Sequence, residues 1–242
     1  MILINYIMIT LFIIIFLSAW TGNIVTSFFY RLPRNIPIHR DHNPPMCSAC
    51  GTKLKFYQYM PLFYRVFCSS KTHCCGTDVP NVYTAIEALV IFSSVITYLT
   101  YGLSNLGLTI MLSIPVITCI LFIFYYNYKI PKDILWAQVL CLIIYRLYGL
   151  QTDLLDIMFV AMFTMVTLLI IEKICKTVLV FDVRIILTTL TVFMPDGFVC
   201  VLYMIFIFIM WFLIAKKIIN NKQSHIAIFS VIALWYPMIL LH

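Results

Sequence analysis

The chain has 242 residues, of which 63% are hydrophobic and 10% are charged, and its mean hydropathy is +1.03. A soluble domain of this length could not bury so much apolar surface, so the composition predicts an all-α membrane protein with several spans. The formal net charge of +7 does not indicate nucleic-acid binding. The basic residues lie in short loops, where Lys and Arg set the topology of a membrane protein. We therefore expect the lipid bilayer, and no nucleic acid, as the partner of this surface.

Apolar runs of about twenty residues mark the expected membrane-spanning helices. The first run lacks a basic start and is too long for a removable signal peptide, so we expect it to be retained. The sixth run is short and ends at the turn sequence Met194-Pro195-Asp196-Gly197, which favours a half-length or tilted helix. The eight expected spans are residues 3–29, 82–102, 107–126, 134–150, 154–172, 184–195, 197–215 and 226–241.

The basic residues are distributed asymmetrically across these spans. Threading the chain back and forth puts fifteen of the sixteen Lys and Arg residues on one side. Because basic loops stay in the cytoplasm, we expect this side to be cytoplasmic and both termini to lie outside. Only Arg146 breaks the pattern, and we expect it to snorkel from the outer end of its helix. We therefore expect three parts: residues 1–30 form the first span, residues 31–81 a cytoplasmic loop, and residues 82–242 the core of remaining spans.

Five of the nine cysteines lie in the loop at residues 31–81. The stretch Cys47-Ser48-Ala49-Cys50-Gly51 has the spacing of a zinc knuckle, because two thiolates three residues apart can bind one tetrahedral ion. The stretch Ala49-Cys50-Gly51-Thr52-Lys53 is echoed by Cys74-Cys75-Gly76-Thr77-Asp78, which predicts a second knuckle. The loop is thus expected to resemble a zinc ribbon, with a structural metal that stabilises a segment poor in apolar residues.

More than one residue is a candidate for the fourth ligand of this site. A regular second knuckle would have a cysteine at position 72, where the chain has Thr72. Cys68 or Cys74 is then required beside Cys75, and we expect Cys68, because adjacent cysteines do not easily bind the same ion. His73 is a weaker candidate. The alternatives to a metal are five free thiols, or a disulfide, which a reducing compartment disfavours.

Two aspartates stand at the cytoplasmic starts of expected helices, Asp133 after Ile130-Pro131-Lys132 and Asp182 before Val183-Arg184. Either one alone is most simply a helix cap or a first-turn residue that the helix dipole favours. Together, two such aspartates can share a proton, so that one activates a water and the other polarises a peptide carbonyl. The topology sends three other carboxylates to the opposite face, namely Asp153, Asp156 and Asp196. Glu87 lies about one turn inside an apolar span, where a carboxylate is costly and has a functional or buried role.

Several stretches together resemble one known family. Gly22 to Pro33, which ends in Tyr30-Arg31-Leu32-Pro33, resembles the end of the first span of the type IV prepilin leader peptidases. The knuckle at Cys47 and the second cysteine cluster before Gly76 follow in the family's order. Three later landmarks also fit, namely Tyr83 to Glu87, Ile130 to Asp133 and Asp182 to Ile186.

The resemblance implies an aspartic endopeptidase of the bacterial inner membrane, with Asp133 and Asp182 as catalytic residues. Such enzymes cut the leader from type IV prepilins or type II secretion pseudopilins at the cytoplasmic face, and many then N-methylate the new terminus with S-adenosylmethionine. Two departures stand out: Leu179-Val180-Phe181-Asp182 replaces the family's Gly-x-Gly-Asp, and Phe124 stands where the first catalytic aspartate is expected, with Asn127 one turn later.

Two other functions remain as alternatives. A catalytically inactive relative would act as a zinc-stabilised membrane scaffold for pilus or secretion assembly. A transporter would use Glu87 as an ion-coupling carboxylate, but the chain shows no inverted repeat and has a large cysteine-bearing loop, which serves transport poorly.

Overall fold

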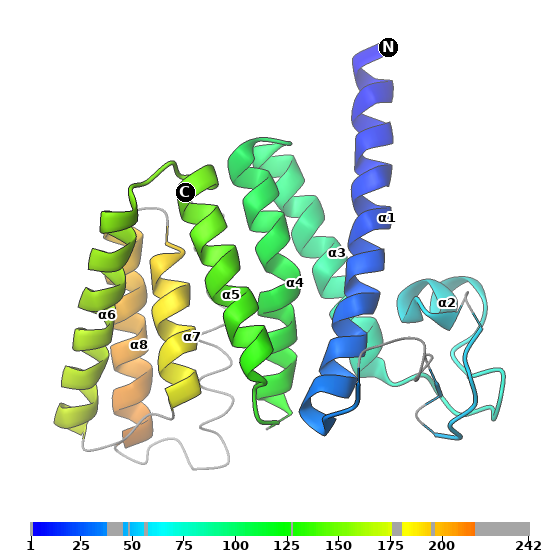
Figure 1. Cartoon of the computed structure of the whole chain (residues 1–242). Coiled ribbons are helices and arrows are strands. Elements are labelled where there is room, and N and C mark those ends of the chain that lie inside the picture. The colour runs from blue at the N-terminus through cyan, green and yellow to red at the C-terminus, as the bar shows by residue number, and fades with distance from the viewer. Residues whose placement is uncertain are drawn as a thin grey trace. The chain divides into compact units, whose positions relative to one another are not determined.

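The computed structural model describes residues 2–37, 46–47, 49–55, 58–126, 128–175, 181–194 and 197–215. The regular structure in these ranges is helical, and the only β-pairing there consists of the isolated bridges Met46–Lys53 and Lys71–Asp78. The helices are α1 (Ile2–Arg31), α2 (Pro61–Phe67), α3 (Asn81–Tyr101), α4 (Asn105–Tyr125), α5 (Lys132–Ile144), α6 (Leu154–Cys175), α7 (Phe181–Val192) and α8 (Gly197–Ala215) (Figure 1). The short turns η1 (Leu32–Arg34) and η3 (Tyr145–Gly149) continue α1 and α5.

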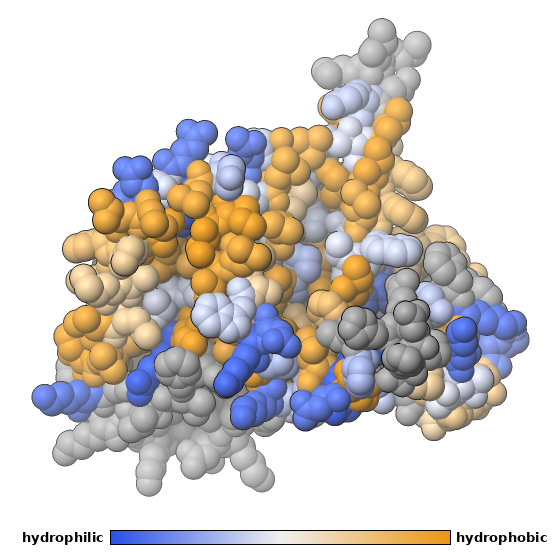
Figure 2. Space-filling model, viewed as in Figure 1, coloured by the Kyte–Doolittle hydropathy of each residue, from blue (hydrophilic) through white to orange (hydrophobic). Residues whose placement is uncertain are grey.

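Three of these helical segments are long and apolar enough to cross a membrane: Tyr6–Arg34, Asn81–Tyr101 and Asn105–Tyr125. Seven of the eight expected apolar runs contain a helix, and the eighth, residues 226–241, lies outside the described residues. The helical fold is thus confirmed, and the count of eight spans stays a prediction. Figure 2 shows hydrophobic side chains over the outer surfaces of α1 and α6, where Phe12 is 70% and Leu155 is 78% exposed, as lipid-facing positions would be.

The chain forms two compact units. The first comprises Met1–Gly102 with Ile114–Phe122, and the second comprises Leu103–Ser113 with Ile123–His242. In the first unit, α1 and α3 pack against each other along small side chains, which let two helix backbones approach closely. At Gly22 of α1 an added Cβ would lie only 3.1 Å from the Cα of Glu87 in α3. The buried small residues of these two helices include Ser18, Ala19 and Thr26 of α1 and Ser93, Ser94 and Thr97 of α3.

In the second unit, the short helix α7 packs against α5, α6 and α8 and carries much of the buried core. Arg146, in the turn η3 after α5, closes the end of α7. Its Nε donates to the carbonyl oxygen of Val192 at 2.6 Å, and its Nη2 donates to that of Met194 at 3.0 Å. The expectation that Arg146 snorkels was wrong, because its side chain is buried and satisfies carbonyl groups that α7 leaves without helical partners.

Candidate metal centre and catalytic aspartates

The cysteine loop contains two turns of the same construction, as the sequence echo predicts. In the first, Cys47 N donates to Thr52 O at 2.9 Å and Gly51 N donates to Cys47 O at 2.9 Å. In the second, Thr72 N donates to Thr77 O at 2.7 Å and Gly76 N donates to Thr72 O at 2.9 Å. Gly51 and Gly76 have φ angles of +71° and +68°, a conformation that side chains other than glycine rarely adopt.

The two turns bring four thiols together. The Sγ atoms of Cys47, Cys50, Cys74 and Cys75 all lie within 4.8 Å of one another. Three of the separations are 3.7 Å (Cys47 to Cys75), 3.3 Å (Cys50 to Cys74) and 3.8 Å (Cys74 to Cys75). Tetrahedral zinc at about 2.3 Å from each sulfur requires sulfur atoms roughly 3.8 Å apart. The four cysteines could therefore hold one metal ion with little movement.

The structure corrects the preferred fourth ligand. Cys68 is exposed at the end of α2 and lies outside the group of four, whereas Cys74 lies inside it. Thr72 occupies the place of the first cysteine of a regular knuckle, and its hydroxyl lies 3.3 Å from Cys75 Sγ. The adjacent thiols of Cys74 and Cys75 lie 3.8 Å apart, and both belong to the group of four. His73 also lies outside the group.

The thiols of Cys74 and Cys75 differ in acidity because their hydrogen bonds differ. The hydroxyl of Thr72, followed by that of Thr77, lowers the pKa of Cys75 to about 6. The thiol of Cys50 beside Cys74 raises the pKa of Cys74 to about 12. Four thiolates so close together would repel one another, so the group binds either protons or a cation. A metal that binds here would displace the remaining thiol protons.

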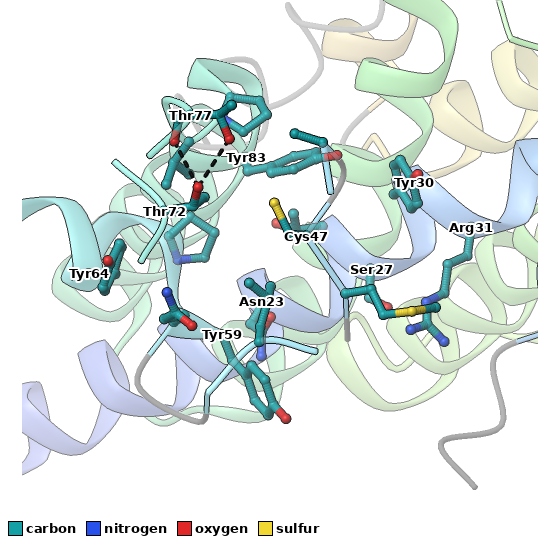
Figure 3. Close-up of a pocket in the computed structure, with 18 of the residues that line it drawn as sticks. Asn23, Ser27, Tyr30, Arg31, Cys47, Tyr59, Tyr64, Thr72, Thr77 and Tyr83 are labelled. Carbon is teal, nitrogen blue, oxygen red and sulfur yellow. Dashed lines mark hydrogen bonds between the residues drawn. The ribbon is translucent and has the colours of Figure 1, made fainter. Parts of the chain in front are cut away.

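A cavity of about 460 Å³ lies between the end of α1, the cysteine loop and the start of α3. Figure 3 shows Asn23 and Ser27 of α1, Tyr59 of the loop and Tyr83 of α3 around it. Asp78 also lines the cavity. Its volume and its mixture of aromatic and polar groups are typical of a site for a small molecule.

The two candidate catalytic aspartates lie at the same end of the second unit. Asp133 is exposed in the first turn of α5, after Pro131 at the N-cap. Asp182 is the second residue of α7, and its side chain lies outside the described residues. Helices α5 and α7 pack together and begin at the same end (Figure 1). Helix α6, which carries Asp156, begins at the opposite end of this unit. The catalytic roles of Asp133 and Asp182 stay predictions.

The family's expected first aspartate position has no carboxylate in the structure. Phe124 is buried near the end of α4, and Asn127 lies outside the described residues.

Glu87 has a partner in the cysteine loop. Its side chain is fully buried, and its Oε2 accepts a hydrogen bond from the backbone N–H of Leu62 at 2.6 Å. Among the described residues, its Oε1 has no hydrogen-bond partner. The carboxylate thus joins the loop helix α2 to the long helix α3.

Sequence reasoning missed Gln138, which lies five residues after Asp133 on α5. Its side chain is 1% exposed, and neither its Nε2 nor its Oε1 has a hydrogen-bond partner in the described part of the chain. An amide inside an apolar run was the available signal, because polar groups in membrane helices usually have a function or a partner.

Residues 16–101 match the family model described as the bacterial peptidase A24 N-terminal domain. The match runs from α1 through the cysteine loop to the last residue of α3, and so lies within the first unit. No curated protein and no solved structure matches the chain.

Proposed function

We propose that this chain is a membrane aspartic endopeptidase that removes prepilin leaders, because residues 16–101 match the model of the bacterial peptidase A24 N-terminal domain and the sequence resembles the type IV prepilin peptidases along most of its length. The substrates are type IV prepilins or type II secretion pseudopilins, cut at the cytoplasmic face of a bacterial inner membrane. The observation that carries the proposal is the family match together with two helices, α5 and α7, that begin with aspartates at one end of the same unit.

In the proposed reaction Asp133 and Asp182 share one proton. The ionised aspartate takes a proton from a water, whose oxygen attacks the carbonyl carbon of the peptide bond that follows the leader. The protonated aspartate donates a hydrogen bond to the carbonyl oxygen, where negative charge develops. When the carbon–nitrogen bond breaks, the proton taken from water passes to the leaving amine.

The cysteine loop has a structural role in this proposal. We assign a zinc ion to Cys47, Cys50, Cys74 and Cys75, whose thiol geometry fits it. Four protein ligands leave no open coordination position, so the ion would stabilise the loop and take no part in peptide hydrolysis.

The test is leader cleavage of a cognate prepilin in membranes that contain the chain, comparing wild type with Asp133→Asn and Asp182→Asn. Both variants are expected to lose cleavage by at least about a hundredfold, because each removes a group that acts on the reacting atoms. Asp156→Asn, at the opposite end of the same unit, is the matched control and should cleave normally. Unchanged cleavage in Asp182→Asn would overturn the assignment.

The same variants distinguish an enzyme from a scaffold. A catalytically inactive relative would bind pilus or secretion components through its loop and helices, and Asp182→Asn would not change that binding. Wild-type protein that captures a prepilin without shortening it would favour the scaffold.

We also propose S-adenosylmethionine as the occupant of the cavity between α1, the loop and α3. The cofactor supplies a methyl group for the new N-terminus. Asp78 suits its positive charge and the rings of Tyr59 and Tyr83 suit its adenine, since aromatic faces attract both cations and flat rings. Binding of radiolabelled S-adenosylmethionine should weaken about tenfold in Asp78→Asn, as expected for a lost charge-assisted contact. Equal binding by wild type and variant would contradict this site.

A further inference from the structure

The short helix α2 exposes an apolar face that no described part of the chain covers. Pro61 and Tyr64 are buried on one side of the helix. On the other side Val66 is 65% exposed and Phe67 is 75% exposed. The ring of Phe63 stacks on that of Phe67, with centroids 6.0 Å apart and planes 22° apart, which extends the exposed surface.

Two contacts fix where α2 lies along the long helices. Its second residue, Leu62, donates its backbone N–H to Glu87 of α3 at 2.6 Å. Glu87 in turn packs on Gly22 of α1, where an added Cβ would lie 3.1 Å from its Cα. Helix α2 packs against α3, and in Figure 1 it lies closer to the N-terminal end of α1 than the turns of the cysteine loop do.

These anchor points lie inside the segments that would cross the membrane. Helix α3 has 21 residues, a length of about 31 Å, so nearly all of it is needed to cross a hydrocarbon core of about 30 Å. Glu87 follows Asn81, the first residue of α3, by six residues, which places it about 9 Å into the core. Gly22 precedes Arg31, the last residue of α1, by nine residues, or about 13 Å. The two helices give consistent depths.

The depth of Leu62 bounds the depth of the exposed rings. Phe67 follows Leu62 by five residues of α2, which is about 7 Å of helix. With Leu62 at about 9 Å, Phe67 lies between roughly 2 and 16 Å below the surface, whatever the tilt of α2. A single leaflet of the core is about 15 Å thick, so at every tilt the exposed face lies inside the hydrocarbon core and reaches at most about its midplane.

We propose that α2 is a re-entrant element whose outer face, formed by Phe63, Val66 and Phe67, contacts the acyl chains of the leaflet on the side of the cysteine loop. Arg65 lies between Phe63 and Val66 in α2, and its long side chain can reach the phosphates of lipid headgroups. The backbone of α2 is helical, and Glu87 accepts a hydrogen bond from the N–H of Leu62, a group that the start of a helix leaves without a helical partner. The lipid contact does not depend on the proposed peptidase activity.

Photocrosslinking of the full chain in phospholipid nanodiscs tests this placement. Phe67→p-benzoylphenylalanine places a photoreactive ketone on the exposed face, and intact-mass measurement after illumination gives the fraction that carries one phospholipid. Phe16 of α1, which is 51% exposed on a spanning segment, is the matched lipid-facing position. Lys53, exposed in the first cysteine turn, is the matched water-facing position.

We expect the lipid-adduct fraction at position 67 to be within about twofold of that at position 16 and at least fivefold above that at position 53. An adduct fraction at position 67 no higher than at position 53 would overturn the proposal. A crosslink from position 67 to a polypeptide, whether a second copy of this chain or a prepilin added to the nanodiscs, would assign the face to a protein partner and would also overturn it. Position 67 is exposed, so the substitution leaves the packed face of α2 intact.

Discussion

Cys74→Ser should weaken metal binding in the cysteine loop, whereas Cys68→Ser should not. The two residues make a matched pair, because both are exposed cysteines of the same loop, six positions apart, and only Cys74 belongs to the group of four thiols. Serine keeps the size of the side chain and removes the thiolate. The comparison therefore isolates the contribution of one metal ligand.

The size of the effect follows from the four-thiol geometry. A structural zinc ion bound by a small domain contributes about 10 to 16 kcal/mol of binding free energy. Divided among four similar ligands, this is about 2.5 to 4 kcal/mol for each thiolate, or a loss in affinity of roughly a hundred- to a thousandfold. Cys47→Ser should cost as much as Cys74→Ser, because the sulfur atoms of both lie within the same 4.8 Å group.

The assay is the zinc content of purified protein after dialysis against a graded series of chelator concentrations. Wild type and Cys68→Ser should each retain one zinc per chain up to the same chelator concentration. Cys74→Ser should lose its zinc at a concentration lower by two to three powers of ten, following the affinity loss above. Zinc retained by Cys74→Ser and lost from Cys68→Ser would refute the assignment and restore Cys68 as the fourth ligand.

Three further predictions concern the loop and the two helical units. In the metal-free protein at pH 7, iodoacetamide should modify Cys75 well before Cys74, because the pKa of Cys75 is about 6 and that of Cys74 is about 12. Cys75 should become unreactive as the pH falls below 6, because its thiol is then protonated. Equal rates of modification of the two cysteines, measured by peptide mapping, would contradict this. Arg146→Met should destabilise the second unit by about 3 to 6 kcal/mol, since it removes two charge-assisted hydrogen bonds. The control Lys129→Met changes an exposed residue and should leave the thermal midpoint unchanged. Gly22→Ala should lower the free energy of unfolding by about 1 to 3 kcal/mol, because the added Cβ would crowd the backbone of Glu87. Ile24→Val on the same helix is the control, and equal thermal midpoints of the two variants would count against the close packing of α1 and α3.

The sequence was sufficient for the features that depend on local pattern. Apolar runs located the helices, and the echo between Cys50-Gly51 and Cys75-Gly76 located two equivalent turns. The fourth thiol could not be identified in the same way. Whether Cys68 or Cys74 reaches the other sulfurs depends on the direction of each side chain in the second turn, which the spacing of cysteines does not determine.

Contacts between residues far apart in the chain could not be predicted from the sequence either. Arg146 was expected to reach water because a long basic side chain can snorkel from the outer end of its helix. Its partners, Val192 and Met194, lie 46 and 48 residues away and are backbone carbonyls, which carry no sequence signature. For Glu87 the sequence indicated a buried role, but not that its partner would be the N–H of Leu62. The helix starts at Asp133 and Asp182 were predictable because each aspartate precedes an apolar run.

We propose above that this chain by itself hydrolyses a prepilin leader. The most direct measurement is mass spectrometry of a cognate prepilin incubated with the purified wild-type chain in lipid, with Asp182→Asn as the blank. We expect a product shortened at one peptide bond, at the junction between the leader and the mature pilin, and no product with the variant. A prepilin that binds the wild-type chain and keeps its full mass would contradict the proposed peptidase activity.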